Sequence, residues 1–207
     1  MSKLRVAVFA SGGGSNLQSI IDNSEQGKIN AQVAVVISNN SKAGALERAA
    51  KHGIPHYHIS VKQFSNEQEY IQKLQAVLTE HQVELVALAG YMKMMPKEII
   101  RRYKNRMINI HPALLPAFGG QGMYGHFVHE AVLAQKVRES GATVHLVDEE
   151  YDQGPIIAQR SVPVLVGDTP ETLAARVLIV EHQLYPEVIQ LFALGRIKVI
   201  DRKVVVS

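Results

Sequence analysis

Asn109 and His111 could supply hydrogen-bond donors to a reacting oxygen atom, because they lie two residues apart at the end of a short apolar stretch. The stretch, Met107 to Ile110, predicts a buried strand. Alternate side chains of a strand share a face, so the amide and the imidazole should point the same way. Such a pair suits a reaction in which negative charge develops on oxygen. The same triplet also occurs where an asparagine caps a turn and a histidine ends a strand, so the pair needs support from other residues.

Asp152 is the carboxylate that could act on this imidazole. It precedes a Gly154–Pro155 turn, between a strand predicted at 143–147 and an antiparallel strand predicted at 156–164. Acidic residues before such turns commonly serve the turn itself. A carboxylate fixed between two strands can also orient a neighbouring histidine and favour its charged form. We therefore expect Asp152 to lie beside His111.

A glycine-rich turn, residues 11–16, follows the first predicted strand, Leu4 to Ala10, and leads into apolar residues at helical spacing. A strand, a glycine turn and a helix start together form an anion site, because free N–H groups and the helix dipole favour a phosphate. The turn lacks the third glycine of a dinucleotide fingerprint and the Gly-Lys-Ser/Thr of a Walker loop. The alternative is a tight turn with Ser15 as N-cap. The candidate phosphate-binding residues are Gly13, Gly14, Ser15 and Asn16.

Three other segments could contact a ligand. A nearly all-apolar strand, 84–89, leads into an aromatic and methionine-rich stretch that offers adaptable surface for an extended aromatic ligand, with core packing as the alternative. Residues 117–125 are glycine-dense and predict a mobile lid. Glu181 follows three apolar residues within a helix predicted from 168 to 194, where it would either lie at the helix flank or bind sugar hydroxyls. The candidate residues of the methionine-rich stretch are Tyr91, Met92, Lys93, Met94 and Met95.

Composition narrows the class of protein. The chain has 207 residues, is 46% hydrophobic and carries a formal charge of +3, which is ordinary for a globular protein and too mild to predict nucleic-acid binding. It has no cysteine, so disulfides and a thiol nucleophile are excluded. His56 and His58 share a face of a short strand without a third ligand nearby, so no metal site is predicted. No apolar run approaches the ~20 residues that span a bilayer, and the expected location is the cytoplasm.

Strands alternate with helices along most of the chain, which predicts an α/β fold with a doubly wound, mostly parallel sheet flanked by helices. The C-terminal part should be antiparallel, with a small hairpin at 197–206. We expect residues 1–207 to form a single domain. Ligands of such sheets bind beyond the carboxyl ends of the strands, where Gly14, Gly90 and His111 should lie.

With these motifs in this order, the chain resembles the phosphoribosylglycinamide formyltransferases, folate-dependent enzymes of purine synthesis with a Rossmann-like fold. The resemblance covers the whole chain, and its most specific parts are the Asn-x-His-Pro-x-Leu-Leu-Pro motif and the later Asp-x-Gly-Pro motif. It rests on Ser11–Asn16, Ala89–Met92, Asn109–Pro116 and Asp152–Pro155.

The resemblance implies transfer of a formyl group from the cosubstrate 10-formyltetrahydrofolate to the primary amine of glycinamide ribonucleotide. The substrate phosphate would lie on residues 13–16 and its ribose hydroxyls near Glu181. Residues 91–95 and the lid would hold the folate, with its pterin near Asp152. Lys93 stands where the family commonly has arginine, so a bidentate contact would become a point charge.

The implied chemistry is direct. The amine attacks the formyl carbon, and Asn109 and a protonated His111 hydrogen-bond the tetrahedral oxyanion. Asp152 keeps His111 charged and helps to move the proton of the amine. Neither a covalent enzyme intermediate nor a metal is needed, and the partners are the two small molecules alone, for a monomer or a homodimer.

The nearest alternatives are other enzymes that use 10-formyltetrahydrofolate, namely a methionyl-tRNA formyltransferase or a formyltetrahydrofolate hydrolase. The first is expected to carry an additional C-terminal domain and the second an N-terminal regulatory domain, and neither would fit in 207 residues. A binding module of the same fold without activity is the alternative from another class. The presence of Asn109, His111 and Asp152 together argues against that module.

Overall fold

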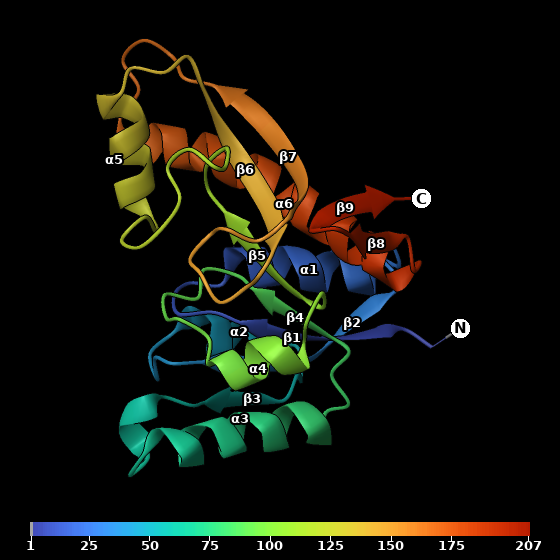
Figure 1. Cartoon of the computed structure of the whole chain (residues 1–207). Coiled ribbons are helices and arrows are strands. Elements are labelled where there is room, and N and C mark those ends of the chain that lie inside the picture. Colours follow the sequence, from blue (N-terminus) through green and yellow to red (C-terminus); the bar gives the residue numbers. More distant parts are fainter. Residues whose placement is uncertain (1) are drawn as a thin grey trace. The chain divides into compact units, whose positions relative to one another are not determined.

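A computed structural model describes residues 2–207 and shows an α/β fold, as predicted (Figure 1). Seven strands form one sheet, and two more form a separate antiparallel sheet. The strands are β1 (Leu4–Phe9), β2 (Ala31–Ser38), β3 (His56–His58), β4 (Leu85–Leu88), β5 (Met107–His111), β6 (Glu139–Leu146), β7 (Ile156–Pro163), β8 (Ile197–Ile200) and β9 (Lys203–Val206). The helices are α1 (Ser15–Glu25), α2 (Gly44–Lys51), α3 (Glu67–Glu80), α4 (Lys97–Arg102), α5 (His126–Ala134) and α6 (Pro170–Ala193), with a 3-10 turn, η1 (Val61–Gln63).

The order of the large sheet is β3-β2-β1-β4-β5-β6-β7. β1 pairs in parallel with both β2 and β4, and β2 pairs in parallel with β3. β6 and β7 pair antiparallel, as do β8 and β9. The predicted fold class, a mostly parallel sheet flanked by helices with an antiparallel C-terminal part, is therefore confirmed.

Two compact units divide the chain, residues 1–108 and 109–207. In the first, β1 lies between two parallel neighbours, and Val6 to Phe9 are fully buried. A strand in that place is covered on both faces, which is why its sequence is continuously apolar rather than alternating. Asn66 caps the N-terminus of α3: its side chain accepts a hydrogen bond from the N–H of Glu69. This cap ends the loop that follows η1.

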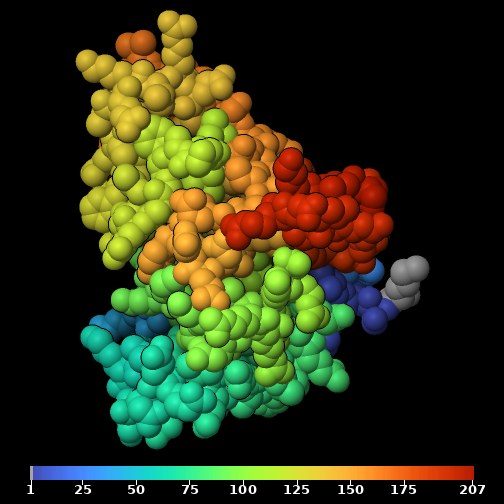
Figure 2. All heavy atoms as spheres, viewed as in Figure 1, coloured from blue at the N-terminus to red at the C-terminus, as the bar shows by residue number. Residues whose placement is uncertain are grey.

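In the second unit, α6 packs on both β6 and β7, and α5 packs on α6. Thr169 starts α6 by accepting a hydrogen bond from Thr172 N–H, and Pro170 occupies the first turn, where it loses no helical hydrogen bond. The β8–β9 hairpin lies at the surface of this unit (Figure 2). Arg202, in the turn between β8 and β9, donates a hydrogen bond at 2.9 Å to the carboxylate of Asp148, which lies in the loop that joins β6 to β7.

Some predicted boundaries shift. The strand expected from His56 ends at His58, because the chain turns into η1, where Ser60 and Gln63 form a capping box. The helix predicted from 168 to 194 runs from Pro170 to Ala193. No helix within residues 2–207 is both long and apolar enough to cross a membrane.

Candidate active site

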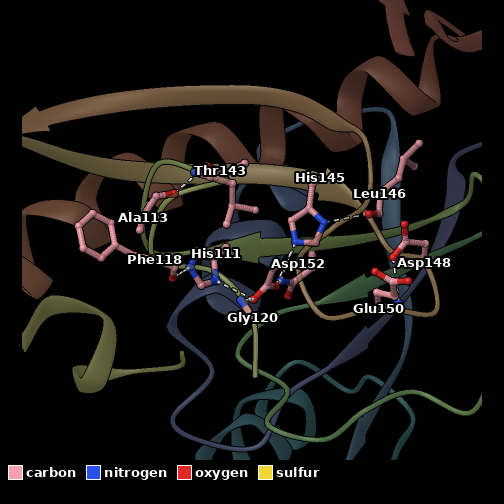
Figure 3. Close-up of polar contacts among 12 residues, drawn as sticks. His111, Ala113, Phe118, Gly120, Thr143, His145, Leu146, Asp148, Glu150 and Asp152 are labelled. Atoms are coloured by element: carbon pink, nitrogen blue, oxygen red, sulfur yellow. Dashed lines mark hydrogen bonds and ion pairs between the residues drawn. The ribbon is translucent and has the colours of Figure 1, made fainter. Parts of the chain in front are cut away.

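His111 and Asp152 lie side by side in the second unit, at the end of β5 and in the β6–β7 loop (Figure 3). Asn109, also on β5, contacts the same carboxylate. The Nδ1 atom of His111 is 3.7 Å from Oδ2 of Asp152. The Nδ2 atom of Asn109 is 3.5 Å from Oδ1 of the same carboxylate, at the limit of a hydrogen bond. The three side chains singled out from the sequence therefore form one polar cluster.

The period of β5 places the amide and the imidazole on one face. Ile108 and Ile110, with 0% and 6% of their surface exposed, alternate with Asn109 and His111 along the strand. Asn109 is half-buried, whereas His111 is only 3% exposed. An imidazole at this depth has lost most of its water, so its partners within the protein decide its protonation state.

His111 donates from Nε2 to the carbonyl oxygen of Phe118 at 2.8 Å, because a carbonyl can only accept. Burial lowers the pKa of His111 below its usual value of 6.5, and the nearby charge of Asp152 only partly opposes this effect. We expected Asp152 to keep the ring protonated. In this arrangement desolvation outweighs the carboxylate, so the His111 ring resists protonation, and a charged ring during the reaction stays a prediction.

Backbone geometry fixes the position of Asp152. Its φ of 56° lies in the left-handed region that few non-glycine residues adopt, although aspartate tolerates it better than most. Two residues on, Gly154 packs so closely on β6 that a Cβ atom there would lie 1.7 Å from the carbonyl oxygen of Leu146. Only glycine therefore lets the loop approach the end of β6 and carry Asp152 inward.

Asp152 is ionised in this environment. Burial raises its pKa, but the hydrogen-bond donors and polar groups around the carboxylate, among them the N–H of Gly120, outweigh burial and hold the pKa below 3.8. The Gly120 N–H donates to Oδ2 at 2.9 Å. The predicted lid thus contacts both members of the pair, through the Phe118 carbonyl and the Gly120 N–H, and its mobility stays a prediction.

His145 is a member of the cluster that sequence reasoning missed. It lies on β6 with 2% of its surface exposed, and its Nε2 atom is 3.1 Å from Nδ2 of Asn109 and 3.5 Å from Oδ1 of Asp152 (Figure 3). The available signal was the alternation of the strand, which puts His145 on the same face as Thr143 and away from the apolar face of Val144. A histidine that shares one face of a strand with a threonine marks either a buried polar network or a site.

The glycine turn lies in the first unit. Gly14 precedes α1 with φ 75° and ψ 33°, and no side chain caps the helix, so the alternative with Ser15 as N-cap is wrong. A Cβ atom on Gly14 would lie 2.8 Å from the Cα atom of Ala45, so both conformation and space require glycine. The Arg48 guanidinium donates to the carbonyl of Gly13 at 2.8 Å. Gly13 is exposed, Ser15 half-buried and Asn16 buried. The turn of the candidate phosphate site is therefore accessible at Gly13, while its C-terminal end at Asn16 is buried.

The methionine-rich stretch begins beside the same turn. The N–H of Met92 donates to the hydroxyl of Ser11 at 2.8 Å, and the Tyr91 ring packs edge-on against Phe9 with its hydroxyl 3.3 Å from that of Tyr70. Burial raises the pKa of Tyr91 far above its usual value, so its hydroxyl stays neutral. The structure does not treat the five residues alike: Met92, Lys93 and Met94 are exposed, Tyr91 is half-buried, and Met95 is 3% exposed and belongs to the core.

Glu181 lies on α6, in the second unit, with 7% of its surface exposed. Burial raises the pKa of Tyr185, one turn further along the helix, and the charge of Glu181 adds to this effect. The structure therefore does not leave Glu181 at an exposed helix flank, which was the less specific of the two expectations. Within residues 2–207, no three His, Asp or Glu side chains are grouped as a metal would require.

This α/β fold, with an amide, an imidazole and a carboxylate gathered at one strand end, matches a known family. The model of the formyl transferase family covers residues 4–189, and the chain belongs to that family. Its curated relatives include a chloroplastic phosphoribosylglycinamide formyltransferase from Vigna unguiculata, 48% identical over 93% of this chain and 62% of that protein. The phosphoribosylglycinamide formyltransferase of Escherichia coli is 38% identical over 94% of this chain and 90% of that protein.

A solved structure agrees with these relatives. The glycinamide ribonucleotide transformylase 1 from Symbiobacterium toebii is 41% identical and superposes with a TM-score of 0.93, over 99% of this chain and 94% of that one. The chain spans about three fifths of the Vigna protein but nearly all of the two bacterial proteins. The resemblance found in the sequence is confirmed.

Proposed function

We propose that this protein transfers the formyl group of 10-formyltetrahydrofolate to the primary amine of glycinamide ribonucleotide, a step of purine biosynthesis. The names of the relatives support formyl transfer to glycinamide ribonucleotide, and the folate donor is what the family resemblance implies. The observation that carries the proposal is the cluster of Asn109, His111 and Asp152, which joins hydrogen-bond donors to an ionised carboxylate within 3.7 Å. Formyl transfer needs these two kinds of group.

In the proposed reaction, the amine attacks the formyl carbon, a new C–N bond forms and the carbonyl oxygen becomes an oxyanion. Asn109 and His111 donate to that oxygen. The intermediate then collapses, the bond between the formyl carbon and the folate nitrogen breaks, and that nitrogen is protonated. The proton lost by the amine passes to the Asp152 carboxylate, directly or through water, and is returned from the site to the folate nitrogen as that nitrogen leaves. The protein side chains contribute hydrogen bonds and proton transfer to this reaction.

The neutral state of His111 fits this sequence. Its ring is neutral before the reaction, because burial lowers its pKa. A developing oxyanion adds a second negative charge beside that of Asp152, and both charges favour the imidazolium. We therefore assign the protonated ring to the transition state rather than to the resting enzyme. The added proton is the one released by the amine, which reaches Nδ1 of His111 by way of Asp152, 3.7 Å away, and later returns to the folate nitrogen. A donor that gains charge only as the oxyanion forms stabilises the transition state more than the substrate.

Other residues are proposed for binding. The N–H groups of the open glycine turn suit the phosphate of the nucleotide, and Glu181 suits the ribose hydroxyls. The exposed methionines of the 91–95 stretch suit the folate ring system, with Lys93 near its acidic tail. We also propose that residues 1–207 act as one formyltransferase domain in the cytoplasm, as a monomer or homodimer. The residues proposed for phosphate are Gly13, Gly14, Ser15 and Asn16, and those for folate are Tyr91, Met92, Lys93 and Met94.

The acceptor decides between this proposal and the other folate enzymes. Purified protein would be given 10-formyltetrahydrofolate with a radiolabelled formyl group and one of three acceptors: glycinamide ribonucleotide, methionyl-tRNA or water alone. We expect label in the ribonucleotide only, at a rate that depends on its concentration. Release of free formate at an equal rate without an amine would show a hydrolase, and no label in the ribonucleotide under saturating folate would refute the proposal.

A further inference from the structure

His145 holds its proton on Nδ1. That atom lies 2.8 Å from the carbonyl oxygen of Leu146, and a carbonyl oxygen can only accept a hydrogen bond. In the neutral ring, the other nitrogen, Nε2, therefore carries a lone pair and no hydrogen. The backbone of β6 thus selects the tautomer, in the way that the partner of one ring nitrogen commonly fixes the role of the other.

The lone pair of Nε2 faces the amide of Asn109. The Nδ2 atom of Asn109 lies 3.1 Å from it, so one N–H bond of the amide is donated to His145. The second N–H of the same nitrogen remains, and its nearest protein acceptor, Oδ1 of Asp152, lies at 3.5 Å, where a hydrogen bond is weak. That second N–H is the one available to a substrate oxygen.

Rotation of the amide by 180° would reverse this arrangement. The side-chain oxygen of Asn109 would then face the lone pair of His145 and the ionised oxygen of Asp152, and both contacts would be repulsive. The oxygen end of the amide would otherwise be hard to distinguish from the nitrogen end, because the two have the same shape. His145 supplies the chemical difference between the two orientations.

We propose that His145 is a positioning residue: as a hydrogen-bond acceptor fixed by the Leu146 carbonyl, it orients Asn109 so that an N–H group, not the amide oxygen, faces the formyl oxygen. This role rests on the proposed formyl transfer.

A double-mutant cycle tests the role through activity. His145→Leu removes the acceptor, and we expect it to lower kcat by about 10²-fold, as for the loss of one oxyanion donor, with KM for both substrates within about 3-fold of the original. In an Asn109→Ala background, the same substitution should lower kcat by less than about 3-fold more, because His145 acts through Asn109. His145→Gln, which keeps an acceptor, should recover about 10-fold of the loss. Equal losses in the two backgrounds would show a merely structural role.

A second measurement does not depend on activity. In ¹⁵N NMR spectra of the unmodified protein at alkaline pH, His145 should have its hydrogen on Nδ1 and a bare Nε2, and the side-chain amide resonance of Asn109 should shift in His145→Gln. A hydrogen on Nε2 would overturn the proposal even if His145→Leu fails to fold. If the unmodified protein transfers no formyl group, the proposed function fails, while the NMR spectrum still decides the orientation of Asn109.

Discussion

The Nε2–H group of His111 donates a hydrogen bond to the carbonyl oxygen of Phe118, at 2.8 Å. The other ring nitrogen faces Asp152 at 3.7 Å, so neither nitrogen is free to meet a substrate oxygen. For His111 to donate to an oxyanion at Nε2, the 118–120 segment must withdraw its carbonyl. We therefore propose that the backbone of residues 118–120 competes with the substrate oxygen for the Nε2–H donor of His111.

Gly119→Ala tests the contact between this segment and Asp152. A Cβ atom at this position would lie 2.5 Å from Cδ2 of Leu115 and 3.2 Å from Cβ of Asp152, so the segment must shift away from the carboxylate. We expect the Gly120 N–H bond to Asp152 to weaken and kcat to fall by roughly 3- to 10-fold, corresponding to about 1 kcal/mol for one hydrogen bond. Gly27→Ala, where an added Cβ atom would have no neighbour within 4 Å, serves as the control for kcat. Unchanged kinetics in Gly119→Ala would show that the contact between Gly120 and Asp152 does not affect the reaction.

Gly154→Ala should affect both stability and activity. The added Cβ atom would lie 1.7 Å from the Leu146 carbonyl oxygen, which is backbone and cannot move aside alone. The loop must shift and carry Asp152 with it, so we expect a loss of about 1–3 kcal/mol in the free energy of unfolding and a fall in kcat. Urea denaturation and steady-state kinetics measure the two effects.

The control for that substitution is Gly53→Ala. Gly53 has φ 65°, and a Cβ atom added there would have no neighbour within 4 Å, so the residue carries the cost of a left-handed backbone without a clash. We expect a loss of about 1 kcal/mol in unfolding free energy and no change in kcat. If Gly154→Ala behaves like Gly53→Ala, the close approach of the loop to β6 does not position Asp152.

Acid should destabilise the protein in two stages. Burial lowers the pKa values of His111 and His129, and for His129 the neighbouring charge of His111 lowers it further. Below about pH 6.5 the unfolded chain binds protons that the folded protein excludes, so the free energy of unfolding falls as pH falls toward the folded pKa values. Asp152, whose folded pKa lies below 3.8, contributes stability above that pH, and this contribution is lost on further acidification.

Urea denaturation at a series of pH values measures this dependence. His129 is buried on α5 and is not assigned a role in the reaction, so His129→Gln removes one of the two lowered pKa values without touching the polar cluster. The slope of unfolding free energy against pH, just below pH 6.5, should become smaller in the variant. An identical slope in the two proteins would show that His129 stays able to protonate in the folded state.

Local sequence patterns were enough for the strands and for the pair on β5. The alternation of Ile108 and Ile110 with Asn109 and His111 predicted the shared face, because strand period depends only on neighbouring residues. The apolar run of β1 likewise predicted a buried strand. Asp152 lies 41 positions after His111 in the numbering, and its place in the cluster was expected from its position between two strands and from the family resemblance.

Three features could not be predicted in this way. The contacts from the Phe118 carbonyl and the Gly120 N–H involve backbone groups that nearly every residue has, so no residue type signals them. The neutral state of His111 depends on its burial, which only tertiary packing decides. Met95 lies in the core while Met92 and Met94 are exposed, although the sequence offers three methionines of the same type within four residues.

The most direct test is the rate of formyl transfer in a single turnover, with enzyme in excess over labelled 10-formyltetrahydrofolate and glycinamide ribonucleotide saturating. The Asn109→Ala protein should fold normally by circular dichroism and transfer the label about 10²–10³-fold more slowly than the unmodified protein, because it lacks one donor to the oxyanion. Asn23→Ala, which removes an amide from α1, should transfer at the original rate. Transfer by Asn109→Ala at the original rate would contradict the account.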